Sequence, residues 1–102
     1  MTHEYTILTG ATVLPGSGRD PCEAIAWAEG TVLALGSEAE VRAISRGDSH
    51  LIAYPGAFVV PLGEVLEIGG PADLMVLAGD PRSDPGTAAP LAVFHRGHSP
   101  SA

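Results

Sequence analysis

The stretch of sequence that decides the fold is Ala24-Ile25-Ala26-Trp27-Ala28-Glu29-Gly30-Thr31-Val32-Leu33-Ala34-Leu35-Gly36. Two apolar runs, residues 24–28 and 31–35, stand on either side of the pair Glu29-Gly30. An acidic residue followed by glycine is typical of the two-residue turn of a β-hairpin, and both flanking runs suit strands. We therefore expect a tight antiparallel hairpin that ends at Gly36.

A short helix is expected directly after the hairpin. Ser37 and Glu40 form a capping-box pair, in which the Ser hydroxyl accepts from the amide three residues on and the Glu reaches back. Val41 and Ile44 then lie on one helical face. Gly47 stands where a helix would stop, so the pattern predicts a helix over residues 37–46.

Short apolar runs separated by Gly and Pro occupy the rest of the chain and predict further strands. Residues 5–8 and 11–14 form either two strands or one strand bent at Gly10. Residues 64–68 alternate polar and apolar side chains, as a half-exposed strand does, whereas residues 74–78 are almost wholly apolar, as in a central strand. The other expected strands are residues 50–54, 57–60 and 91–95.

These elements give a mainly β fold, a small β-sandwich or open barrel of about seven or eight short strands with one short helix. The 102 residues fit a single domain spanning residues 1–102. Residues 79–90 read as a surface loop. The expected core residues are Ile7, Val13, Ile25, Trp27, Val32, Leu35, Leu74, Val76 and Val93.

Composition excludes several classes of function. The chain has 5 basic and 12 acidic residues, a formal charge of −7, so neither a nucleic-acid surface nor a basic membrane patch is expected. No apolar run approaches the roughly 18–20 residues of a membrane span. The first residues lack the pattern of a secretion signal. Cys22 is the only cysteine, so no intrachain disulfide is possible, and we expect a cytoplasmic protein.

Few side chains suggest chemistry. The histidines His3, His50, His95 and His98 are candidates for metal binding, but a strand leading into glycine does not bring His95 and His98 together, and surface histidines are the simpler interpretation. Asp73 follows a Gly-Pro turn and reads either as a ligand or general base, or as a structural acceptor of backbone amides. Cys22 reads as a plain, partly buried thiol, with only Arg19 nearby to activate it. We expect no cofactor.

The order of these segments resembles the small β-domain of the amidohydrolase superfamily, the metal-dependent hydrolases that include imidazolonepropionase-like enzymes. Residues 7–14 resemble its opening strand, residues 24–36 its hairpin and residues 51–56 its lead into the catalytic barrel. Residues 68–77 resemble the strand pair that resumes the domain after the barrel, and residues 91–97 its closing strand. The chain would thus join an N-terminal half, residues 5–56, to a C-terminal half, residues 63–97, through a short connector.

The departures from this family lie at the metal motif. Val59 stands where the family has an Asp, and Pro61 and Gly63 stand where it has two His ligands. None of these side chains binds a divalent metal. The barrel itself is replaced by the few residues of the connector, so the resemblance carries over no catalytic residue.

The resemblance implies a stand-alone, non-catalytic interaction or oligomerisation module, which is not an enzyme on its own. Loss of a barrel uncovers a face that family members bury, so we expect a homo-oligomer or a complex with a separately encoded hydrolase barrel. The enzymatic alternatives are a subunit that completes a split amidohydrolase acting on C–N bonds, or a new site built from His50, His95, His98 and Asp73. The remaining alternatives are a small-molecule binding domain or a recently decayed gene product with no role.

Overall fold

The described part of the chain consists of short strands and one short helix. The computed structural model describes residues 5–16, 18–44, 49–63, 65–81 and 90–97. Within these residues the elements are β1 (Tyr5–Thr9), β2 (Thr12–Val13), β3 (Ala24–Ala28), β4 (Thr31–Gly36), α1 (Glu38–Ile44), β5 (Ser49–Ala53), β6 (Phe58–Pro61), β7 (Leu74–Leu77) and β8 (Pro90–Phe94).

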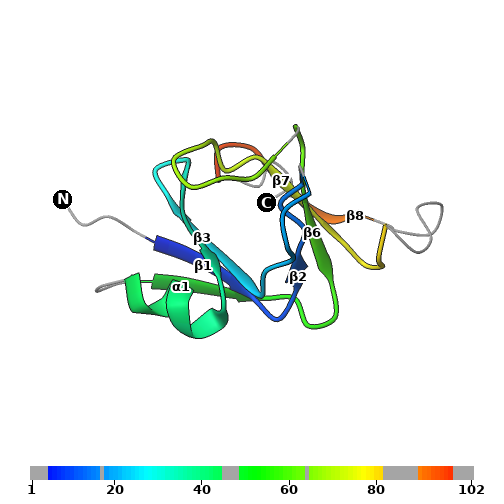
Figure 1. Cartoon of the computed structure of the whole chain (residues 1–102), viewed down its shortest axis with the longest axis horizontal. Coiled ribbons are helices and arrows are strands. Elements are labelled where there is room, and N and C mark those ends of the chain that lie inside the picture. Colours follow the sequence, from blue (N-terminus) through cyan, green and yellow to red (C-terminus); the bar gives the residue numbers. More distant parts are fainter. Residues whose placement is uncertain (1–4, 17, 45–48, 64, 82–89, 98–102) are drawn as a thin grey trace.

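The strands form two sheets of four strands each. The first sheet has the order β4-β3-β1-β5, and the second has the order β2-β6-β7-β8. Figure 1 shows the first sheet on the left, with α1 against its outer side, and the second sheet on the right. Both sheets are mixed, because β1 pairs with β5, and β2 with β6, in parallel. The expected mainly β class, a small sandwich or open barrel with one helix, is confirmed.

The hairpin of β3 and β4 has the expected bounds and turn. Glu29 and Gly30 both take left-handed backbone conformations, with φ of 52° and 77°, as the favoured two-residue hairpin turn requires. All five residues of β3 are buried, because this strand has core on one face and α1 on the other. The alanines of the hairpin let the helix approach closely, and Val41 of the helix packs there in a small buried cluster with Ile7, Ala24, Ala26 and Ala34.

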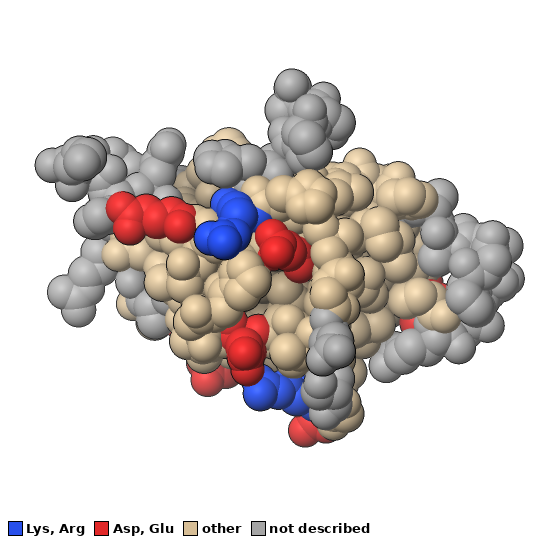
Figure 2. Space-filling model, turned by 90° about the horizontal axis from the view of Figure 1, so that it is seen from above, with Lys and Arg blue, Asp and Glu red and all other residues tan. Residues whose placement is uncertain are grey.

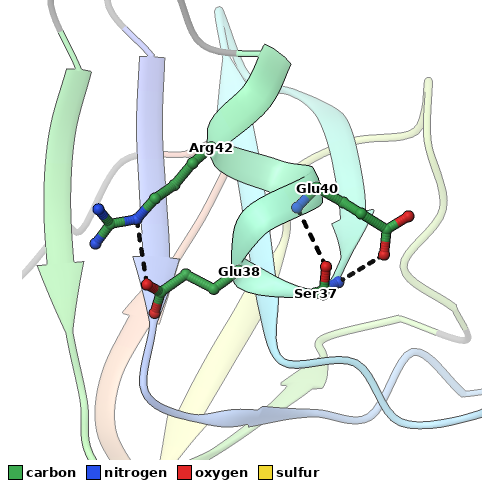
Figure 3. A network of polar contacts seen from close by, with 4 residues as sticks. All are labelled: Ser37, Glu38, Glu40 and Arg42. Carbon is green, nitrogen blue, oxygen red and sulfur yellow. Dashed lines mark hydrogen bonds and ion pairs between the residues drawn. The ribbon is translucent and has the colours of Figure 1, made fainter.

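The helix α1 begins with the predicted capping box. The amide of Glu40 donates to Ser37 Oγ at 3.1 Å, and the amide of Ser37 donates to Glu40 Oε1 at 3.2 Å (Figure 3). Hydrogen bonding from Ser37, first from its backbone amide and then from its side chain, lowers the pKa of the Glu40 carboxyl below its ordinary value. Val41 is fully buried against the first sheet, as the helical face predicts. The expected end at Arg46 lies outside the described residues.

The chain passes from the first sheet to the second at two points that share one corner. β1 continues into β2 through Gly10, and β5 continues into β6 through the bend at Gly56. The amide of Gly56 donates to Gly10 O at 3.2 Å. Gly10 has a φ of +81°, and a side chain there would press on the backbone of Pro55 at 3.3 Å. Residues 5–14 are therefore two strands that belong to different sheets, which settles the choice left open by the sequence.

Residues 65–68 do not form the predicted strand. The alternation is genuine, since Leu66 is fully buried and Glu67 is exposed. However, this segment crosses between the sheets, and it bonds to a different neighbour at each step: the amide of Leu66 donates to Pro15 O at 2.8 Å, and that of Gly69 donates to Val32 O at 2.8 Å. No ladder can form along one partner strand, so the prediction of a strand over residues 64–68 is wrong.

The core lies between the inner faces of the two sheets. Trp27 from β3 packs on Phe94 from β8, with ring centroids 5.3 Å apart. Most of the predicted core residues belong to this cluster, whereas Ile7 faces α1 instead. Val93 was assigned to the core wrongly. Leu74 pairs with Phe94 and Met75 with Val93, so the inward side chain of this part of β8 is Phe94, and Val93 lies on the outer face.

Candidate functional site

The two described histidines among the candidate metal ligands lie far apart in the topology. His50 is exposed on β5, at the edge of the first sheet, and His95 is exposed just after β8, at the edge of the second. His3 and His98 lie outside the described residues. Within the described ranges, no three residues among His, Cys, Asp and Glu are grouped as metal ligands would be. The fold thus assigns the two described histidines to separate sheets.

Asp73 accepts a backbone amide, although not from its own turn. Its Oδ1 receives the amide of Arg96 at 2.8 Å, which ties the start of β7 to the residues that follow β8. Arg96 has a φ of 51°, and the hydrogen bond that its amide donates to the Asp73 carboxylate holds it in this uncommon conformation. The carboxylate is thus placed as the structural interpretation expects, with a partner that is distant in sequence.

The positions that the resemblance aligns with metal ligands lie in and beside β6. Val59 is fully buried and pairs with Val13 on one side and Val76 on the other. Pro61 is the last residue of β6, and Gly63 lies two residues after it. A valine within the core, a proline and a glycine offer no side-chain donor, so these positions do not fit a divalent metal ion.

A hollow of about 370 Å³ lies beside Cys22. Its walls combine apolar groups with one ion pair, in which Arg19 Nη2 lies 3.7 Å from Glu67 Oε2. Burial, followed by the negative charges of Asp20 and Glu40, raises the pKa of the Cys22 thiol, so the thiol is a poor nucleophile at neutral pH. The lining residues are Pro15, Arg19, Asp20, Cys22, Leu35, Glu67 and Ile68.

Sequence reasoning did not find this hollow. Its walls come from the loop before β3, from β4, and from the crossing segment that contains Glu67 and Ile68. The sequence predicts a strand over residues 64–68, and that strand would not have placed Glu67 beside Arg19. No local signal in the sequence marks these residues as neighbours.

The edge of β5 is the most exposed apolar feature of the first sheet. Leu51 is 50% exposed, although it stands in register with the buried Ile7 on the neighbouring strand. Ala53 is exposed as well, whereas Ile52 points inward and packs on the core. Within the described residues, α1 lies over β4, β3 and β1 and leaves β5 uncovered.

Charged side chains are dispersed on the face seen in Figure 2. The basic groups on this face lie beside acidic ones, among uncharged residues, and no continuous basic area appears there. On α1, Arg42 Nε lies 3.3 Å from Glu38 Oε2, one helical turn away. Half-exposed ion pairs of this kind add little stability, so their main effect is to set the local pattern of charge.

Comparison with known proteins gives no relative. No family model, no curated protein and no solved structure matches this chain. Among the described residues, no helix is both long and apolar enough to cross a membrane. The amidohydrolase resemblance of the sequence therefore stays a prediction.

Proposed function

We propose that the chain is a non-catalytic interaction module related to the small β-domain of amidohydrolases. The observation that carries this proposal is the place of β6. The segment that would start the catalytic barrel in the family lies here between β2 and β7, in the middle of the second sheet. Its Val59 fills the core where a metal-binding carboxylate would otherwise stand.

The position of β6 also supports the idea of a domain that closed after losing a barrel. β2 comes from the N-terminal half, and β7 and β8 come from the C-terminal half, yet all three share one sheet through β6. The connector thus supplies the strand that joins the halves. A domain completed in this way has a core of its own, and its remaining role is to present a surface to a partner.

The catalytic alternative is tested on the purified chain. We expect no stoichiometric zinc after purification, and no turnover of a panel of amides and cyclic imides when equimolar zinc is added. The matched control is the same sample treated with a chelator, because trace contamination by a true hydrolase is recognised by activity that does not scale with bound metal. Stoichiometric metal together with chelator-sensitive turnover would overturn the proposal.

The hollow beside Cys22 favours a second candidate, the binding of a small molecule. Its volume falls at the lower end of the range usual for ligand pockets, and its Arg19–Glu67 pair offers both a cation and an anion to a polar group. A fragment screen by amide chemical shifts tests this candidate. Shifts confined to residues around Cys22, and abolished by Ile68→Arg but kept in Leu62→Arg, would support it. A screen with no such hit removes it.

A further inference from the structure

We infer that two copies of this chain pair through the open edges of their β5 strands, antiparallel and about a two-fold axis, to join their first sheets into one. This inference rests on the proposed interaction function and names its partner, a second copy. The two sheets have four edge strands, β4, β5, β2 and β8. An edge strand with unpaired backbone groups is a template for another strand unless something protects it.

Three of the four edges are protected or interrupted. β4 is flanked by the segment after the crossing, since the amide of Val32 donates to Gly70 O at 2.9 Å and Thr31 forms a bridge with Pro71. β2 has only two residues, and Val13 is already bridged to Cys22. β8 begins at Pro90, which has no amide to donate.

The edge of β5 carries no such protection in the described part of the chain. Its five residues, Ser-His-Leu-Ile-Ala, include no proline and no Asp, Glu, Lys or Arg. Charged side chains and prolines are the usual devices that keep an edge strand from pairing. β5 is therefore the one edge of this fold that is long enough to pair and lacks these devices within the described residues.

The exposed apolar side chain of β5 lies on the face of the first sheet that carries α1, and it suits a partner placed there. Leu51 is half-exposed beyond the flank of α1, whereas the inward Ile52 is already held by the core. A second β5 placed alongside would cover Leu51 without disturbing the core. Leu51 is the middle residue of β5, so an axis through it sets Leu51 against its own copy, with Cα atoms about 4.5–5.5 Å apart.

The acidic and basic side chains of α1 are complementary to those of a second copy related by a two-fold axis. Figure 3 shows the Glu38–Arg42 pair leaving the helix on the side of β1, the neighbour of β5. About the proposed two-fold axis, the two copies of α1 run antiparallel. The two β1 strands then lie roughly 14 Å apart, because three strand spacings separate them. Glu38 and Arg42 then stand in opposite order on the two copies, so that the acid of one copy lies across the interface from the base of the other.

Sedimentation equilibrium of the full chain tests the interface. The unmodified chain is expected to dimerise, and Leu51→Lys is expected to weaken the dimer about tenfold or more, since it sets two cations against each other on the axis. The matched control is Leu91→Lys on the edge strand β8, because Leu91 is 53% exposed against 50% for Leu51. The control should leave the dissociation constant unchanged.

Cross-linking provides a readout that does not depend on the lysine variant folding. In a Cys22→Ser background, Leu51→Cys should form a disulfide-linked dimer on mild oxidation, because residues facing each other across an antiparallel pair satisfy disulfide geometry. Leu91→Cys should not. Trp27 fluorescence confirms that each variant is folded.

The outcomes separate this interface from the proposed function. A dimer abolished by Leu91→Lys and kept by Leu51→Lys would place the contact on the second sheet, which overturns the β5 interface and leaves the interaction function standing. A chain that stays monomeric at every concentration and does not cross-link at Leu51→Cys overturns the interface as well. Metal-dependent turnover would instead overturn the proposed function, whichever strand the copies share.

Discussion

Gly97 holds the end of the chain's last described segment against the indole of Trp27. The Nε1–H of Trp27 donates to Gly97 O at 3.3 Å, and the amide of Gly97 donates to Ala72 O at 2.9 Å. Gly97 has a φ of +79°, and a Cβ built on it would lie 2.6 Å from Trp27 Cδ1. Two separate requirements therefore fix glycine at this position, a left-handed backbone and an absence of side-chain volume.

The two requirements can be measured apart. Gly97→Ala should lower the free energy of unfolding by more than the roughly 1–2 kcal/mol that a left-handed backbone costs a residue with a Cβ, since the methyl group also displaces Trp27. Gly56→Ala is the control, because Gly56 has a φ of +77° with open space around its Cβ position. Urea unfolding followed by Trp27 fluorescence gives both values. Equal losses for the two variants would mean that the Trp27 contact adds nothing.

At the scale of elements, the start of α1 carries a pH-dependent contribution. The pKa of Glu40 is lowered by the bonds from Ser37, so its contribution to stability is present above the unfolded pKa and is lost as pH falls through the folded pKa. Glu40→Gln should therefore destabilise the chain at neutral pH, and the difference should close as pH falls through the lowered pKa and the native carboxyl becomes protonated. Urea unfolding at several pH values measures this.

The control for the helix start is Ser37→Ala. Loss of an N-cap hydroxyl costs about 1 kcal/mol, and this loss should persist into the acid range because the hydroxyl does not titrate there. A loss for Glu40→Gln that stays constant with pH would show that the Glu40 carboxylate contributes through packing and not through charge.

The inward face of β6 is the element-level basis of the proposed function. Val59→Asp restores the carboxylate that the family would have there, and it should destabilise the fold by roughly 3–5 kcal/mol because the charge is buried without a partner. Val60→Asp, one residue on, places the same group on the partly exposed outer face and should be tolerated far better. Thermal unfolding compares the two. Equal tolerance would mean that β6 does not lie in the sheet.

Local signals in the sequence were sufficient for the hairpin and the helix. Glu29-Gly30 has the backbone that its composition favours, and Ser37 and Glu40 make both bonds of the capping box. The failures concern relations between elements. The alternation of residues 64–68 has the period of a strand but gives no information on whether a partner strand runs alongside. The error at Val93 has the same origin, because the register with Leu74 and Met75 decides which face of β8 is inward.

For the candidate site, the sequence was informative only about single positions. One of its two interpretations of Asp73, an acceptor of backbone amides, agrees with the bond observed, but the sequence did not predict the partner Arg96, which lies 23 residues later, beyond both β7 and β8. The hollow beside Cys22 and the uncovered edge of β5 depend on which strands become neighbours. Such long-range arrangements have no signature within a short window of residues.

At the scale of the whole molecule, the single-domain prediction has a direct test. The core includes Leu8, Ile25 and Trp27 from the first sheet and Val59 and Phe94 from the second, so neither sheet keeps its inner face dry alone. Thermal unfolding followed by Trp27 fluorescence and by far-ultraviolet circular dichroism should give coincident transitions. Separate midpoints would mean that the two sheets unfold independently and that the chain is not one cooperative unit.

The corner at Gly10 and Gly56 also governs the order in which the chain can fold during its synthesis. β2 has only β6 as its neighbour in the sheet, and β6 leaves the ribosome long after β2 does. Local pairs such as β3–β4 form early, whereas parallel pairs between distant segments must first close a long loop, which slows folding. A nascent chain that has not yet reached Pro61 therefore holds β2 without its neighbour in the sheet, bridged, among the described residues, only to Cys22.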